Sequence, residues 1–169
     1  MIPVRVIVAA LLVAASAIPA TARASEADVA DAIAQFVNAE TNSFAGLQGK
    51  QTNDDGTYVY YDSSVQIPGS SACAIYTYKK TGDKYGTCDF AADTEQEART
   101  YYDALTKIIQ KIEPGWEIDP IDPPPHGHLV ALIAKDPQNT RGIYLYVDTS
   151  DPKNIRVTTT FGTPAALKS

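Results

Sequence analysis

The feature that most constrains the fold is a change of hydrophobic period that occurs twice along the chain. The stretch from Glu26 to Ala39 and the stretch from Asp93 to about Glu113 carry apolar side chains at helical spacing, and alternation with a period of two follows each of them. This pattern predicts an α+β fold in which two helices pack on an antiparallel sheet. The predicted buried stripes are Val29, Ile33, Phe36 and Val37 in the first helix, and Ala98, Tyr101, Tyr102, Leu105, Ile108, Ile109 and Ile112 in the second.

Start and stop signals bound both helices. Ser25 is a suitable N-cap, with acidic residues in the turn that follows, where the helix dipole favours them. Asp93 with Gln96 three residues later has the pattern of a capping box for the second helix. Pro114-Gly115 is predicted to end that helix.

Short runs rich in β-branched and aromatic residues follow each helix, separated by Gly, Asn, Asp and Pro. The strands predicted in the first half are Phe44–Lys50, Thr57–Asp62, Cys73–Lys79 and Lys84–Phe90, and those in the second half are Trp116–Ile118, His128–Lys135, Ile143–Asp148 and Ile155–Phe161. Because Thr81-Gly82-Asp83 lies between the last two strands of the first half, these two strands are predicted to form a hairpin.

A helix followed by four strands thus occurs twice, in the halves 25–92 and 93–169 of one domain, 25–169. The segment Ala74-Ile75-Tyr76-Thr77-Tyr78 aligns with Gly142-Ile143-Tyr144-Leu145-Tyr146. This match favours a tandem duplication, but Ile-Tyr-x-Tyr is a common strand pattern, so a chance match stays open. The repeated helix-then-sheet order resembles that of secreted inhibitor proteins that bind β-lactamases, in element order and without a shared motif.

The first 24 residues have the pattern of a secretory signal peptide. Arg5 supplies the positive n-region, an apolar run of ten residues extends from Val6 to Ala15, and Ala22-Arg23-Ala24 offers the small residues of a cleavage site. A single membrane anchor is the alternative, but this run is shorter than the roughly 20 residues that span a bilayer. The sequence therefore predicts export to the periplasm or the medium and no membrane association after cleavage at Ala24.

The charge of the chain argues against nucleic acid and anionic membranes as partners. Removing residues 1–24 leaves 12 of the 14 basic and all 20 acidic residues, a formal charge of −8. Nucleic acids and anionic lipids attract clustered Lys and Arg. The 145 residues that follow position 24 in the 169-residue chain suffice for one domain with a sizeable core.

Cys73 and Cys88 are the only cysteines. An even pair in an exported protein predicts a disulfide, which would close the predicted hairpin and stabilise the fold by roughly 3 kcal/mol. A catalytic thiol is the alternative, but the chain has no C-x-x-C pair, and a free thiol outside the cell tends to be oxidised.

Tyrosines recur at every second position in three predicted strands. The alternation of a strand turns such residues to one face, opposite the aliphatic residues between them. If the helices cover the aliphatic face, the other face carries a row of rings suited to recognising a protein or a glycan, although tyrosine also favours strands for structural reasons alone. The residues of this predicted recognition surface are Tyr58, Tyr60, Tyr76, Tyr78, Tyr144 and Tyr146.

Both histidines of the chain, His126 and His128, lie at the end of a Pro-rich segment that also contains Asp119 and Asp122. Two imidazoles and two carboxylates are suitable ligands for Zn²⁺ or Cu²⁺. The simpler interpretation is a rigid loop with surface imidazoles, since no further histidine or free thiolate completes a site.

The common catalytic and cofactor motifs are largely absent from the sequence. Gly69-Ser70-Ser71-Ala72 lacks the final glycine of a nucleophile elbow, and Asn53-Asp54-Asp55-Gly56 lacks the distal glutamate of a calcium loop and reads as a turn. The leading hypothesis is therefore an exported, non-enzymatic binding protein, an inhibitor or accessory factor without a cofactor, whose partner is a protein. The alternatives are a metal-binding protein or enzyme at the histidine loop, and a carrier of a small apolar ligand lined by Trp116, Tyr101 and Tyr102.

Overall fold

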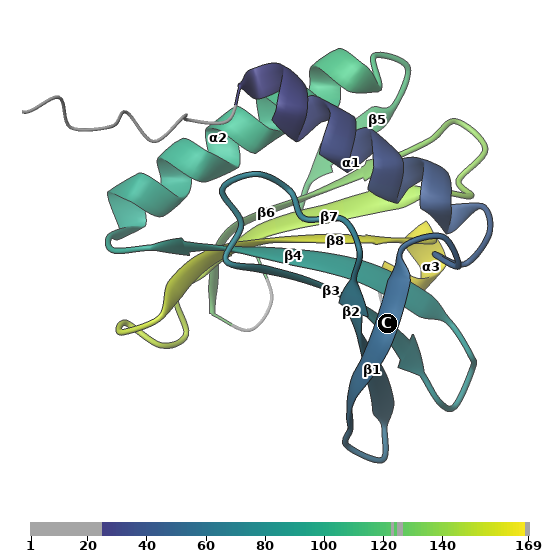
Figure 1. The fold of residues 1–169 in the computed structure, drawn as a ribbon. Coiled ribbons are helices and arrows are strands. Elements are labelled where there is room, and N and C mark those ends of the chain that lie inside the picture. Colours follow the sequence, from purple (N-terminus) through teal and green to yellow (C-terminus); the bar gives the residue numbers. More distant parts are fainter. Residues whose placement is uncertain (1–24, 123, 125–126, 168–169) are drawn as a thin grey trace, which may run out of the picture.

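The two predicted helices pack side by side on one face of an antiparallel sheet (Figure 1). The computed structural model describes residues 25–122, 124 and 127–167. Within them the order is α1 (Glu26–Glu40), β1 (Gln48–Asp54), β2 (Tyr58–Ser63), β3 (Ala72–Tyr78), β4 (Lys84–Ala92), α2 (Glu95–Ile112), β5 (Glu117–Pro120), β6 (His128–Lys135), β7 (Gly142–Asp148), β8 (Ile155–Gly162) and α3 (Pro164–Leu167). The α+β class is confirmed.

The predicted signal peptide, residues 1–24, lies outside the described residues. None of the described helices combines the length and the apolar character that crossing a membrane requires.

The two halves of the chain meet in the middle of the sheet. In the described residues the strand order is β1-β2-β3-β4-β8-β7-β6-β5, and every neighbouring pair is antiparallel. Ile75 pairs with Gly86, Ile143 pairs with Phe161 at the corresponding position, and Gly86 pairs with Phe161. Two similar units are therefore related by an approximate two-fold axis through the Gly86–Phe161 pair. A duplication of the sequence itself stays a prediction.

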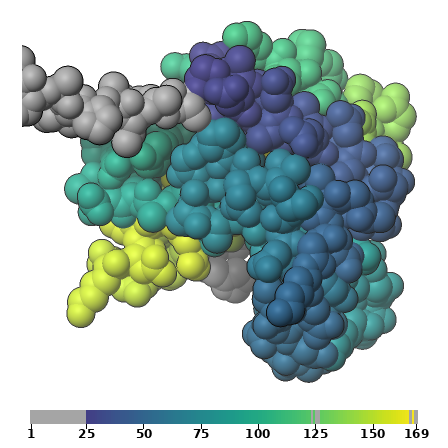
Figure 2. Space-filling view, in the orientation of Figure 1, coloured from purple at the N-terminus to yellow at the C-terminus, as the bar shows by residue number. Residues whose placement is uncertain are grey.

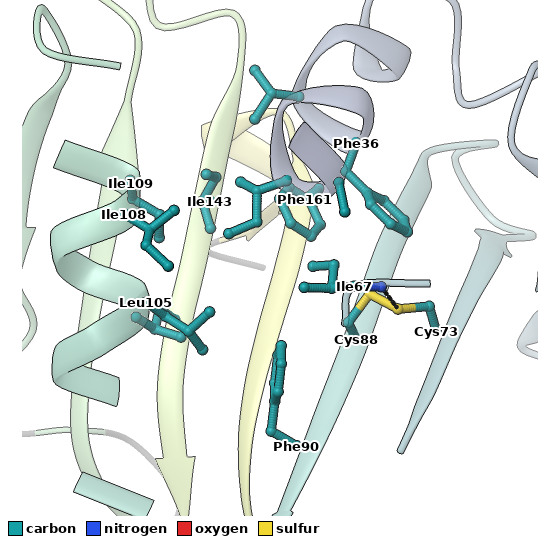
Figure 3. Close-up of a cluster of buried hydrophobic side chains, with 14 of the residues drawn as sticks. Phe36, Ile67, Cys73, Cys88, Phe90, Leu105, Ile108, Ile109, Ile143 and Phe161 are labelled. Atoms are coloured by element: carbon teal, nitrogen blue, oxygen red, sulfur yellow. Dashed lines mark hydrogen bonds between the residues drawn. A yellow bond between two sulfur atoms is a disulfide. The ribbon is translucent and has the colours of Figure 1, made fainter. Parts of the chain in front are cut away.

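The Gly86–Phe161 pair also shapes the core under α1. The rings of Phe161 and Phe36 stack with their centroids 4.8 Å apart, and both side chains are fully buried (Figure 3). A Cβ at Gly86 would lie only 2.7 Å from Cδ1 of Phe36 and 3.1 Å from Cε1 of Phe44. The missing side chain of Gly86 thus lets the Phe36 ring of α1 approach the sheet closely, and Phe161, across the axis, stacks against the same ring.

The predicted disulfide between Cys73 and Cys88 is present. The two cysteines pair directly across the predicted β3–β4 hairpin, and both are buried on the side that faces the helices (Figure 3). The backbone nitrogen of Ile67 lies 3.4 Å from Sγ of Cys73. The disulfide therefore links the hairpin and the loop before it within the core.

The helix starts agree with the sequence at α1 and differ by one residue at α2. Ser25 and Asp28 form a reciprocal capping box for α1. In α2 the cap is Thr94, whose hydroxyl accepts a hydrogen bond from the Glu97 N–H at 3.1 Å, so the predicted Asp93–Gln96 box is wrong. A threonine hydroxyl can cap a helix as an aspartate does, which shifts the cap by one position.

The predicted stripe of α2 is buried except at its margin. Tyr101 is 36% exposed, with its ring centroid 6.4 Å from that of Phe90, and Tyr102 and Ile112 are half-buried. Tyr101 therefore lies at the edge of the helix–sheet contact, not in the core.

The first strand differs most from the prediction. β1 is Gln48–Asp54, not Phe44–Lys50. Phe44 belongs to the turn after α1, with a φ of 58°, yet its ring is buried in the core, as is Leu47. β1 itself is a polar edge strand, so no apolar alternation marks it. Phe44 and Leu47 pack a turn onto the core. Their apolar pattern alone does not distinguish such a turn from the start of a strand.

The short helix α3, which the sequence did not predict, folds back onto the face of the sheet opposite α1 and α2. A Cβ at Gly142 would lie 3.1 Å from Cγ of Pro164, and a Cβ at Gly162 would lie 3.5 Å from Cδ2 of Leu167. These two glycines pair with each other in β7 and β8, and their missing side chains make room for α3.

Candidate binding site on the open face of the sheet

The face of the sheet away from α1 and α2, called the open face here, is where the tyrosines gather. Strand alternation in β3 and β7 turns the aliphatic residues to the core and the tyrosines to the open face, as predicted. The β1–β2 hairpin (blue) and the β7–β8 turn (yellow) project on this side of the molecule (Figure 2). The predicted residues Tyr58, Tyr60, Tyr76, Tyr78, Tyr144 and Tyr146 all lie here, and each is half-buried.

One group of rings, called the β2–β4 cluster, comprises Tyr58, Tyr60, Tyr76, Tyr78 and Tyr85. Tyr76 stacks on Tyr85 with a centroid distance of 5.1 Å and meets Tyr58 edge-on at 5.6 Å and 89°. Tyr58 also lies 5.1 Å from Tyr78, and Tyr60 lies 5.9 Å from Tyr76. Tyr85 is buried and was missed from the sequence, although its place opposite Tyr76 follows from the predicted hairpin.

A second group, called the β6–β7 cluster, comprises His128, Tyr144 and Tyr146. The ring of His128 stacks on that of Tyr146 at 4.0 Å, and the two tyrosine rings lie 4.9 Å apart. Nδ1 of His128 and the hydroxyl oxygen of Tyr144 are 3.1 Å apart, which is a hydrogen-bond distance. His128 is therefore part of the aromatic surface.

A pocket of about 200 Å³ lies between the two clusters. Thr160 of β8 pairs with Thr87 of β4 on one side and with Tyr144 on the other, so small side chains separate the clusters at the centre of the sheet. The pocket is lined by Tyr58, Tyr76, Tyr85, His128, Tyr144, Tyr146, Thr160 and Leu167.

Two of the tyrosine hydroxyls have partners within the protein. The hydroxyl of Tyr60 donates to Asp55 at 2.9 Å, and that of Tyr144 lies 3.1 Å from Nδ1 of His128. Burial raises the pKa of Tyr76 well above its usual range, and the phenols of Tyr146 and Tyr85 beside it add to this shift. Burial also raises the pKa of Tyr144 and Tyr146. These phenols are therefore neutral at any physiological pH.

Charged groups lie at one margin of the open face. The Thr158 hydroxyl donates to Asp89 at 2.6 Å, and Arg156 forms an ion pair with Asp148 at 2.9 Å. The charges of Asp89 and Arg156 both act on the phenol of Tyr146. A ligand on the open face would thus meet aromatic rings at the centre and paired charges at the rim.

The predicted metal ligands are not brought together in the described part of the chain. His126 lies outside it, Asp122 is exposed, and Asp119 accepts a hydrogen bond from Lys135 at 2.9 Å. Asp119 pairs with Ile133, five positions from His128 along β6, which at about 3.3 Å per residue separates the two by roughly 16 Å. No group of three His, Cys, Asp or Glu side chains that could hold a metal occurs among the described residues.

The residues suggested for an apolar ligand are likewise dispersed. Tyr102 of α2 lines a pocket of about 330 Å³ together with Ile121 and Leu129, beside the Pro-rich segment. Trp116 packs against the core, with the Arg141 guanidinium 5.5 Å from the centre of its ring, and Tyr101 is on the surface.

The open face thus combines aromatic rings, hydroxyls and an imidazole around a shallow pocket, which suits binding by ring contact. Comparisons of the chain with models of protein families, with curated proteins and with solved structures find no match.

Proposed function

We propose that this protein is an exported, non-enzymatic binding protein that recognises its partner, a protein, with the tyrosine clusters of the open face. The observation that carries the proposal is the position of the clusters. They occupy the middle of the sheet, where both halves of the chain meet, on the face that α1 and α2 leave uncovered.

Ring packing within each cluster supports this function. Tyrosine offers a large amphipathic contact area and has few rotatable bonds, so ordering it on binding costs little entropy. Here the rings are already held by one another and by hydrogen bonds of their hydroxyls. Such preorganised aromatic residues are typical of the few positions that contribute most of the free energy of a protein–protein contact.

The predicted export is supported by the disulfide. Disulfides such as Cys73–Cys88 persist in oxidising compartments and are rare in the cytosol. A binding protein outside the cytoplasm would also fit the signal-peptide pattern of the first 24 residues.

The test is affinity capture from culture medium and cell extracts with the purified protein as bait, followed by mass spectrometry and a measured dissociation constant. Tyr76→Ala and Tyr144→Ala each remove one ring from one cluster, and Tyr101→Ala removes an exposed tyrosine of α2 as the matched control. We expect each cluster variant to weaken binding by about 30-fold, the effect of a strong interface residue, and the control to bind normally.

Folding of each variant is checked by its urea midpoint, because Tyr76 packs against several rings. If Tyr76→Ala does not fold, Tyr58→Ala replaces it in the same cluster. A partner that binds folded cluster variants as tightly as the unchanged protein, or no stoichiometric protein partner in any fraction, would overturn the proposal.

A further inference from the structure

The pocket between the two clusters has walls made of rings. Tyr58 and Tyr76, whose rings meet edge to face at 89°, line one side of the pocket, and Tyr144 and Tyr146 line the opposite side. Ring faces carry negative electrostatic potential, and they attract cations that approach within about 6 Å of the centroid. Several such walls around one small volume would add their attraction.

The charges around the pocket also favour a cation as ligand. His128 is the one basic residue that lines the pocket; none of the other lining residues is Lys, Arg, Asp or Glu, and the chain as a whole has a formal charge of −6. Arg156, whose charge reaches Tyr146, is neutralised by its ion pair with Asp148. A cation in the pocket would therefore interact with rings and with a negative protein, and it would not displace an ionic partner.

The lining of the pocket narrows the kind of cation. None of the residues that line the pocket is Asp or Glu, so the N–H donors of a primary ammonium or a guanidinium would meet no carboxylate there. A quaternary ammonium carries no N–H and needs ring faces only.

We propose that this pocket binds the quaternary ammonium group of a small organic cation. The volume agrees, since about 200 Å³ is below the roughly 300–1,000 Å³ of pockets that enclose drug-sized ligands. The inference goes beyond the proposed function, because it assigns a small-molecule ligand to the centre of the same surface.

The experiment is calorimetric or NMR titration of the purified protein with choline chloride. The matched ligand is dimethylbutanol, the neutral analogue in which carbon replaces the quaternary nitrogen, and potassium chloride at equal concentration controls for ionic strength. We expect saturable binding of choline and binding of the neutral analogue that is at least about tenfold weaker, because only the cation gains the ring attraction.

Variants locate the binding. Tyr58→Leu removes a ring and is expected to weaken choline binding about tenfold, whereas Tyr58→Phe keeps the ring and is expected to bind as the unchanged protein does. Tyr146→Leu tests the opposite wall, and Tyr101→Leu on α2 is the control outside the pocket. Tyr58 is half-buried and contacts the rings of Tyr60, Tyr76 and Tyr78, so the urea midpoint of each variant is measured before the titration.

Three outcomes would overturn the inference: no saturable choline binding, equal binding of choline and its neutral analogue, or choline binding that survives both wall substitutions. The two proposals fail by different results. If a protein partner is lost on substitution of the clusters but choline neither binds nor competes with it, the recognition surface stands and the cation site does not.

Discussion

Replacement of Glu40 by glutamine is expected to stabilise the protein near neutral pH and to leave its stability almost unchanged at pH 4.5. Glu40 is the last residue of α1, and its Oε2 accepts a hydrogen bond from the Gly142 N–H at 3.1 Å. Its Oε1 is buried without a hydrogen-bond partner among the described residues. Burial raises the pKa of Glu40 from 4.5 to about 9, against the opposing effects of the Gly142 hydrogen bond and the charge of Arg141.

The sign and the size of the effect of Glu40 on the free energy of unfolding follow from this raised pKa. The carboxyl is neutral in the folded protein and ionises with a pKa near 4.5 when unfolded, so its contribution is fully present below pH 4.5 and is lost as the pH rises towards 9. Each pH unit corresponds to about 1.36 kcal/mol, so about 2.5 units between pH 4.5 and pH 7 cost at most about 3 kcal/mol. Asp136 and Glu113 are further acidic neighbours that raise the pKa.

Glu40→Gln does not lose this stability as the pH rises, because the glutamine amide is neutral at every pH. Its oxygen can still accept the hydrogen bond from the Gly142 N–H. At pH 4.5 the protonated carboxyl of Glu40 and the amide of glutamine both put a hydrogen-bond donor at the same buried place. The free energies of unfolding of the variant and the unchanged protein should therefore agree within about 1 kcal/mol. At pH 7 we expect Glu40→Gln to be more stable by about 2–3 kcal/mol.

Urea unfolding at several pH values between 4.5 and 8 measures this difference directly. Asp62→Asn, which removes a carboxylate from an exposed position of β2, is the control for a general change of charge. The reasoning is refuted if the stability difference between Glu40→Gln and the unchanged protein is the same at every pH. A constant difference would mean that Glu40 is not a neutral carboxyl in the folded state.

Two further predictions concern the core. Gly86→Ala should lower the free energy of unfolding by about 1–3 kcal/mol, because its Cβ would overlap the Phe36 ring. Gly46→Ala, whose Cβ would have nothing within 4 Å, should change this free energy little, and equal urea midpoints for the two variants would contradict the packing argument. The double substitution Cys73→Ala and Cys88→Ala should cost about 3 kcal/mol through the loop of 15 residues that the disulfide closes, and an unchanged midpoint would exclude that role.

Much of the fold could be predicted because its core-facing elements have clear periods. β6 begins and ends at the predicted residues, and β7 and β8 differ from prediction by one residue at one end. The elements that the sequence did not reveal lack such a period. β1 is polar along its length, and α3 is a single turn that depends on Gly142, distant in the sequence, as well as on Gly162 just before it.

The candidate site was predicted in part, for a similar reason. Alternation places tyrosines on a common face of a strand, and this was enough for the positions on β2, β3 and β7. It does not say which strands become neighbours, so the pairing of β4 with β8 and the pocket at that junction were not foreseen. The stacking of His128 on Tyr146 was missed because the two histidines at i and i+2 suggested a metal ligand pair instead.

The pocket exists because the two halves are not identical at equivalent positions. The two-fold relation matches Tyr76 with Tyr144 and therefore matches their partners, Tyr85 in β4 and Thr160 in β8. Tyr85 stacks on Tyr76 and fills the space beside it, whereas Thr160 is too short to do the same beside Tyr144. A symmetric molecule would have either two filled positions or two empty ones. The ring that is present on one side and missing on the other leaves an opening walled by both clusters, so the difference between the two halves generates the candidate binding site.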